Sequence, residues 1–153
     1  MSPKIVVGVD GSEHSFAAYR WALEESKRRG GDVTAIFAWQ LPLIGIPGAF
    51  DREELEVDAK RYLNELLDQQ PSAEGVAVER VVVQGDPSNS LIEAVKRADA
   101  DLLVLGTRGR GGFAGLLLGS VGQECAAHSP CPVVICGLNG EQPDQPGQLA
   151  PSS

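Results

Sequence analysis

The chain has 153 residues, of which 42% are hydrophobic and 22% charged, and its formal net charge is −8. This length suits one compact domain that needs neither disulfides nor metals, and the negative charge argues against a broad basic surface for nucleic acid or anionic lipid. No stretch approaches the ~20 apolar residues of a membrane span, and the amino terminus lacks the layout of a signal peptide. We therefore expect a cytoplasmic protein with no nucleic-acid and no membrane partner.

The first part of the chain predicts two strands, each followed by a helix. Residues Lys4–Val9 form a short β-branched run, and the helical spacing after it ends at Gly30-Gly31. A second strand is expected over Val33–Trp39, and the segment 40–50 that follows is long enough to cover a site. In the first helix Ala18, Trp21 and Ala22 form the apolar stripe and Glu25 continues its helical spacing. The apolar stripe of the second helix is Leu55, Ala59, Tyr62, Leu63, Leu66 and Leu67.

The second part of the chain continues the same alternation. A third strand is expected over Val76–Val83, and Asp86-Pro87 is a strong helix start because an acidic N-cap precedes a proline at the first helical position. We predict a fourth strand over Asp101–Leu105, a short helix over Ser120–His128 and a fifth strand over Pro132–Cys136. The buried face of the third helix is Leu91, Ala94, Val95 and Ala98.

Strands that alternate with helices predict an α/β domain with a five-stranded, mostly parallel sheet and helices on both faces. In such sheets ligands bind outside the carboxyl ends of the strands, where the strand order reverses. The positions after Val9, Phe37 and Leu105 are therefore the first places to look for a site. The domain is expected over 1–137, and the polar, Pro- and Gly-rich tail 138–153 is expected to be disordered.

A glycine-rich segment, Gly106-Thr-Arg-Gly109-Arg-Gly111-Gly112, follows the fourth strand directly. Its backbone N–H groups can turn toward one anion, and the helix that opens at Ser120 can supply a second phosphate contact. A flexible connector is the alternative, and the position after a strand favours the phosphate site. Ser120 with Gln123 also fits a capping box, in which the hydroxyl serves only the helix.

Other polar residues carry weaker signals. Arg108 and Arg110 can pair with phosphate oxygens, although exposed arginines are more often solvated. Asp10 can hold a ribose hydroxyl or, through water, Mg²⁺, and the alternative is a turn residue before the first helix. His14 is expected on the surface, and His128 is expected simply to end the fourth helix.

Several known chemistries lack their signature in this sequence. The GxxxxGK[ST] phosphate loop is absent, and Gly109-x-Gly111-x-x-Ala114 follows the wrong strand for a dinucleotide site. Neither histidine lies in a recognisable nucleophile motif, so the sequence does not demand an enzyme. Cys125, Cys131 and Cys136 lack CxxC spacing and are expected to be small apolar residues rather than a disulfide framework or zinc site.

Three motifs together resemble the ATP-binding subgroup of the universal stress protein family. Gly106-Thr-Arg-Gly109, nine residues and Gly119-Ser120 match its G-x-x-G-x9-G-[S/T] pattern, and IVVGVDGS and His128-Ser-Pro-Cys-Pro-Val133 are similar to its other conserved segments. The resemblance implies a Rossmann-like, adenine nucleotide alpha hydrolase-like domain, a homodimer formed through Pro132–Cys136, and a stress-response regulator that contacts a protein partner. It implies ATP as the ligand, to which the Mg²⁺ considered for Asp10 would bind through water, and AMP or cyclic AMP is a further candidate.

The resemblance also implies a set of nucleotide contacts, in which Ala38 meets adenine through its backbone. At most slow ATP hydrolysis is implied, and no catalytic residue. The expected contacts are Gly8, Asp10, Ala38, Gly106, Thr107, Arg108, Gly109, Arg110, Gly111, Gly112, Gly119, Ser120, Val121 and Gly122.

Overall fold

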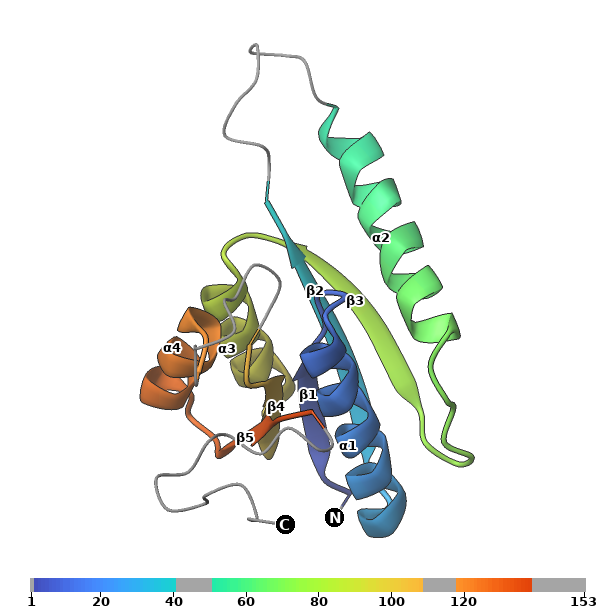
Figure 1. The fold of residues 1–153 in the computed structure, drawn as a ribbon, viewed down its shortest axis with the longest axis vertical. Coiled ribbons are helices and arrows are strands. Elements are labelled where there is room, and N and C mark those ends of the chain that lie inside the picture. The colour runs from blue at the N-terminus through green and yellow to red at the C-terminus, as the bar shows by residue number, and fades with distance from the viewer. Residues whose placement is uncertain (1, 41–50, 109–117, 139–153) are drawn as a thin grey trace, which may run out of the picture.

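A computed structural model describes residues 2–40, 51–108 and 118–138 of the chain, which form one α/β domain (Figure 1). The segments 41–50 and 139–153, on which the covering loop and the disordered tail were predicted, lie outside the described residues. The elements are β1 (Lys4–Gly8), α1 (Glu13–Arg29), β2 (Asp32–Trp39), α2 (Arg52–Asp68), β3 (Val78–Gln84), α3 (Pro87–Ala98), β4 (Leu102–Gly106), α4 (Ser120–His128) and β5 (Val133–Cys136).

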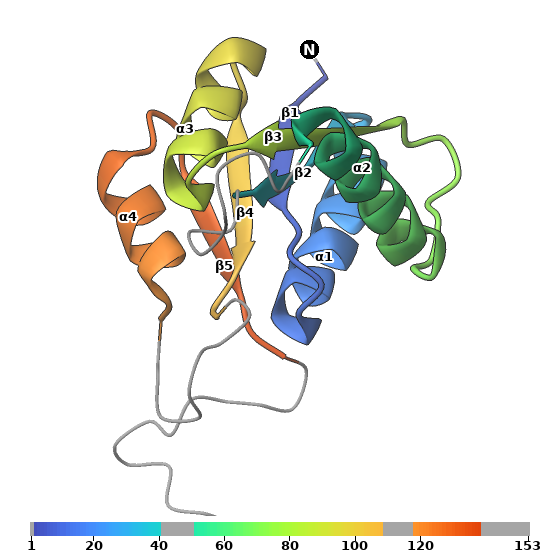
Figure 2. The ribbon, with the colours of Figure 1, turned by 90° about the horizontal axis from the view of Figure 1, so that it is seen from above.

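The five strands form one sheet in the order β3-β2-β1-β4-β5, and every pair is parallel. Helices α1 and α2 lie on one face of the sheet, and α3 and α4 lie on the other (Figure 2). The predicted fold class is therefore confirmed. Because β1 stands between β2 and β4, the order along the sheet reverses beside β1, and the carboxyl ends of β1 and β4 meet there.

The helices begin and end at the residues that local chemistry favours. Helix α1 begins after Ser12, whose Oγ accepts from the backbone N of Ser15 over 3.1 Å, and ends at Gly30 in the left-handed conformation (φ 72°). Helix α3 has the predicted N-cap Asp86, which accepts from the backbone N of Asn89, followed by Pro87. These caps fix where each helix meets the sheet.

Two apolar layers hold the helices on the sheet, one on each face. The first lies under α1 and α2, and the second lies under α3 and α4, so alternate residues of the central strands enter opposite layers. The first layer includes Ile5, Val7, Phe16, Ala18, Ala22, Leu63 and Val104, and the second includes Val6, Ile36, Leu91, Val95, Leu103 and Cys125.

The third strand differs most from its expected bounds. It starts two residues later, at Val78, because the backbone N of Val76 donates to Ala73 O over 3.2 Å in a turn, while pairing with β2 begins at Val78 opposite Val33. The other strand ends shift by at most one residue. Within the described ranges no helix is long and apolar enough to cross a membrane.

Candidate functional site

The end of β4 and the start of α4 are joined directly by the backbone. The backbone N of Gly119 donates to Thr107 O over 2.7 Å, and the backbone N of Thr107 donates to Cys136 O, at the end of β5, over 2.9 Å. The two ends of the connection between β4 and α4 therefore lie together at the carboxyl end of the central strands. Its middle, with Gly109, Arg110, Gly111 and Gly112, lies outside the described residues.

Helix α4 begins without a side-chain cap. Its N-cap is Gly119, which has no side-chain hydrogen bond, whereas Ser12, Asp51 and Asp86 cap the other three helices of the described chain with side-chain oxygens. An α-helix leaves its first N–H groups without intrahelical acceptors, and its dipole makes that end attract anions. The N–H groups of Ser120, Val121 and Gly122 belong to this first turn.

The capping-box alternative for Ser120 is wrong. Ser120 is the first helical residue rather than the N-cap, and the Gln123 side chain instead donates from Nε2 to Leu118 O over 2.8 Å. Gly119 takes the N-cap position because its carbonyl accepts from the backbone N of Gln123 over 3.0 Å. The exposed hydroxyl of Ser120 is therefore not engaged in a capping box with Gln123.

His14 contradicts the expectation of a surface residue. It is only 8% exposed, and its ring bonds to two residues of the glycine-rich segment: Nδ1 lies 2.7 Å from Thr107 Oγ1 and Nε2 lies 3.0 Å from Arg108 Nη2. The first turn of α1 is buried against the end of β4, which is why a polar residue there is covered. A Cβ on Gly106 would lie 2.6 Å from the His14 backbone, so glycine permits this close approach.

Asp10 acts in the turn that leads into α1. Its Oδ1 accepts from the backbone N of Ser12 over 2.9 Å, and its own backbone N donates to Ser15 Oγ over 3.2 Å. This confirms the turn role for Asp10. The carboxylate is half-buried at the carboxyl end of β1, beside the place where the strand order reverses.

Gly8 and Ala38 lie at the carboxyl ends of the neighbouring strands β1 and β2. Gly8 is the last residue of β1, and a Cβ there would lie 2.9 Å from Leu105 Cδ2, so its small size serves internal packing. Ala38 is half-buried near the end of β2 and pairs with Val83 of β3. Both residues thus lie at the carboxyl ends of the strands, as Asp10 and Thr107 do.

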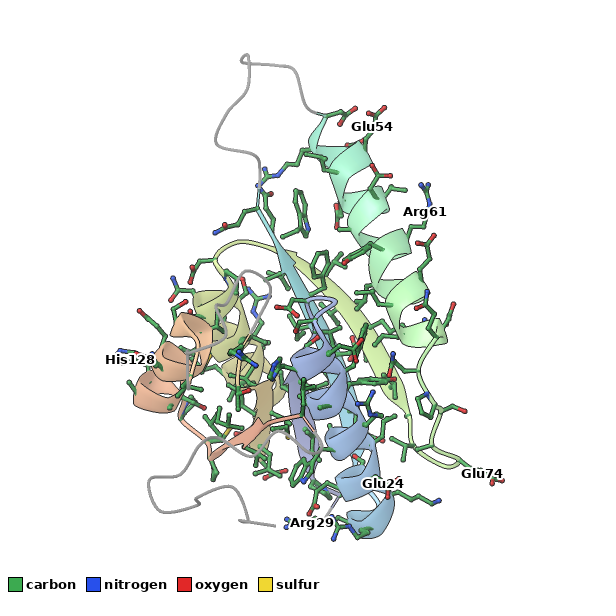
Figure 3. All side chains as sticks on the ribbon, in the orientation of Figure 1. Glu24, Arg29, Glu54, Arg61, Glu74 and His128 are labelled. Atoms are coloured by element: carbon green, nitrogen blue, oxygen red, sulfur yellow. The ribbon has the colours of Figure 1, made fainter. Side chains whose placement is uncertain are left out.

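The second histidine and the three cysteines were not expected to take part in a site. His128 is exposed at the end of α4 and lies at the outer edge of the molecule, as expected (Figure 3). Cys125 is buried and Cys131 and Cys136 are half-buried, which confirms their apolar role. Burial, with smaller contributions from Glu124 and Asp86, raises the pKa of Cys125 to about 11, and burial raises the pKa of Cys136 to about 11.

The fold and this cluster define a class of protein: a doubly wound α/β domain in which a helix without a side-chain cap begins near the point where the strand order reverses. The model of the universal stress protein family matches residues 1–137, and the chain belongs to that family. Universal stress protein Rv2623 of Mycobacterium tuberculosis is 37% identical over 132 residues, which cover 86% of this chain and 44% of that relative. The chain thus spans less than half the length of that curated relative.

Shorter relatives match over most of their own length. Universal stress protein MJ0531 of Methanocaldococcus jannaschii is 32% identical over 136 residues, which cover 86% of this chain and 80% of that relative. A solved universal stress protein in complex with cAMP is 27% identical, has a TM-score of 0.64, and is matched over 89% of this chain and 97% of that chain. The family expectation and the Rossmann-like α/β fold are therefore confirmed.

Proposed function

We propose that this chain binds an adenine nucleotide, with its phosphates at the edge of the sheet between the end of β4 and the start of α4. The observation that carries the proposal is the hydrogen bond from Gly119 N to Thr107 O, because it holds an uncapped helix start beside the glycine-rich segment. Two anion-attracting features, glycine-rich backbone and a helix N-terminus, then act on one place.

The side chains at this place fit a phosphate group. The Thr107 hydroxyl donates hydrogen bonds, the Arg108 guanidinium supplies positive charge, and the exposed Ser120 hydroxyl stands at the helix start. The chain as a whole is acidic, so this local group of donors is what would attract an anion. Asp10 supplies one carboxylate, which suits Mg²⁺, because that ion is held mainly by substrate phosphates and water.

Adenine and ribose would occupy the neighbouring strand ends. We infer that Gly8 and Asp10 lie beside the ribose and that the Ala38 backbone meets the base, since these residues lie at or just beyond the carboxyl ends of β1 and β2. The related solved structure is described as a complex with cAMP, which supports an adenine ligand for this chain. ATP is our first candidate, with AMP and cyclic AMP as the alternatives.

The bound nucleotide would serve regulation in the stress response. Strand β5 lies at an open edge of the sheet in the described chain, so Pro132–Cys136 is available for a second copy to form the homodimer that we propose. Nucleotide occupancy at the end of β4 would reach this edge through the bond between Thr107 N and Cys136 O. A partner protein would then read the dimer surface.

Calorimetric titration with ATP, ADP, AMP, cyclic AMP and GTP, with and without Mg²⁺, tests the proposal. We expect saturable binding that prefers adenine, and weaker binding in Gly109→Ala and Ser120→Ala. A sharper variant is Ser120→Asp: its carboxylate suits the first turn of α4, so the fold is kept, but it repels phosphate and abolishes binding. Ala127→Asp adds the same charge at an exposed site near the other end of α4 and is the matched control.

Two results would count against the proposal. If no nucleotide binds to the unmodified chain, the glycine-rich segment is only a connector. If Ser120→Asp binds as tightly as Ala127→Asp, the phosphates lie elsewhere. Phosphate release, measured in the same samples, distinguishes a binding protein from a slow ATPase.

A further inference from the structure

The buried imidazole of His14 joins the two residues that open the glycine-rich segment. Nδ1 faces Thr107 Oγ1 at 2.7 Å and Nε2 faces Arg108 Nη2 at 3.0 Å, so one ring spans consecutive side chains. The backbone that carries this ring packs directly against Gly106 and leaves no room for a Cβ there, so the start of α1 lies tightly against the end of β4. His14 thus connects α1 to the end of β4 through the side chains proposed to meet phosphate.

The chemistry of the partners fixes the direction of these hydrogen bonds. A guanidinium only donates, so Nε2 of His14 must accept from Arg108 and cannot carry a hydrogen. The imidazole is then neutral with its hydrogen on Nδ1, and it donates to Thr107 Oγ1. Since this oxygen accepts from His14, the hydroxyl hydrogen of Thr107 is directed to another acceptor.

We propose that His14 is a positioning residue for the nucleotide phosphates, acting through Arg108 and Thr107. It holds the guanidinium at the end of β4 and turns the Thr107 hydroxyl hydrogen outward, so that both groups face one anionic oxygen cluster. This inference rests on the proposed function, and it adds a residue to the site that no glycine pattern contains. The ring does not touch the ligand.

Two conservative variants separate the two hydrogen bonds. In His14→Asn the side-chain amide nitrogen stands where Nδ1 stood and keeps the donation to Thr107, but it loses the acceptor for Arg108. In His14→Gln the amide oxygen stands where Nε2 stood and keeps that acceptor. We expect ATP affinity to fall about tenfold in His14→Asn and to stay within about threefold of the unmodified chain in His14→Gln.

A double-mutant cycle with Arg108→Ala decides whether His14 acts through Arg108. If it does, Arg108→Ala loses about tenfold in affinity, and His14→Asn adds little to that loss. Additive losses would overturn the proposal, because they mean that His14 merely supports the fold. Circular dichroism of each variant checks that α1 and the sheet are formed before affinities are compared.

A second readout needs no ligand. The chain has two histidines, so nitrogen-15 spectra of the imidazoles resolve His14 with exposed His128 as an internal reference. We expect the Nδ1-protonated tautomer for His14 near neutral pH, and a hydrogen on Nε2 of His14 would overturn the proposal. If no nucleotide binds to the unmodified chain, the proposed function fails, whereas this spectrum still shows whether His14 holds Arg108.

Discussion

Gly119 and Thr107 form one short backbone hydrogen bond, of 2.7 Å, that closes the segment between β4 and α4. This bond holds the start of α4 next to the end of β4, although no side chain caps the helix. We call this contact the junction between the strand and the helix. The junction gives a direct test in amide exchange.

We expect the Gly119 amide to exchange slowly with solvent, because its hydrogen is bonded to Thr107 O, and the Ser120 and Val121 amides to exchange rapidly in the free protein. Saturating ATP should slow the Ser120 and Val121 amides, since phosphate would accept from them. Nuclear magnetic resonance measures all three amides in one experiment. Rapid exchange at Gly119 would mean that the junction opens in solution.

Gly106→Ala should destabilise the fold by about 1 to 3 kcal/mol, because its Cβ would lie 2.6 Å from backbone atoms of His14 that cannot move aside. Gly8→Ala is the matched control: its Cβ would meet the side-chain ends of Leu105 and Leu91, which can shift. Urea unfolding of both variants measures which substitution lowers the free energy of unfolding more. An equal or larger loss in Gly8→Ala would show that α1 does not pack tightly on β4.

Asp86→Ala should lower the free energy of unfolding by about 0.5 to 2 kcal/mol, because α3 loses its N-cap oxygen. Glu93→Ala removes an exposed carboxylate from the same helix, whose ion pair with Lys96 spans 3.5 Å at the surface, and should change stability by under about 0.5 kcal/mol. Urea unfolding compares the two. Similar losses would mean that the cap contributes little.

The thiols of Cys125 and Cys136 should react slowly with iodoacetamide at pH 8. Burial raises the pKa of each to about 11, so only about one thiol in a thousand is ionised at that pH. Mass spectrometry of Cys131→Ser counts these two thiols without the third. Rapid labelling before unfolding would contradict their burial, and labelling in urea is the positive control.

Stability should fall as the pH rises from 9 toward 11. The folded pKa of Cys136 is raised from 9.0 to about 11, so the folded state keeps its proton longer than the unfolded state. The contribution of this pKa shift to the free energy of unfolding is fully present below pH 9 and is lost as the pH rises to 11. Urea midpoints of the unmodified chain and Cys136→Ala over this range measure the difference, and parallel curves would mean that Cys136 does not contribute.

The sequence predicted the strands and helices because their signals are local. Asp86-Pro87 and Gly30 fix helix ends through their own chemistry, and β-branched runs mark the buried strands. The third strand was placed too early because Val76 continues the apolar run, while the turn bond to Ala73 that excludes it is not visible in the pattern.

The candidate site was only partly predictable. Glycine spacing pointed to the segment after β4, since backbone freedom leaves a trace in sequence. His14 was missed because its burial depends on contact with Thr107, 93 residues away, and not on its own helix. The one available signal was Gly106. A glycine there indicates that another segment packs closely, but it does not show which residue that is. The capping-box alternative for Ser120 was wrong because Gly119, which has no side chain, takes the N-cap position.

Strands β1 and β4 lie side by side in the sheet, yet they are farther apart in sequence than any other paired strands in the described chain. The backbone N of Asp101 donates to Lys4 O over 2.8 Å, so β1 is made first and completes its pairing only after β4 has been synthesised. The nucleotide site that we propose therefore needs residues from both the first and the last part of the domain. A nascent chain that stops before α4 would lack it. Ligand binding would then report that translation and folding of the whole domain are complete.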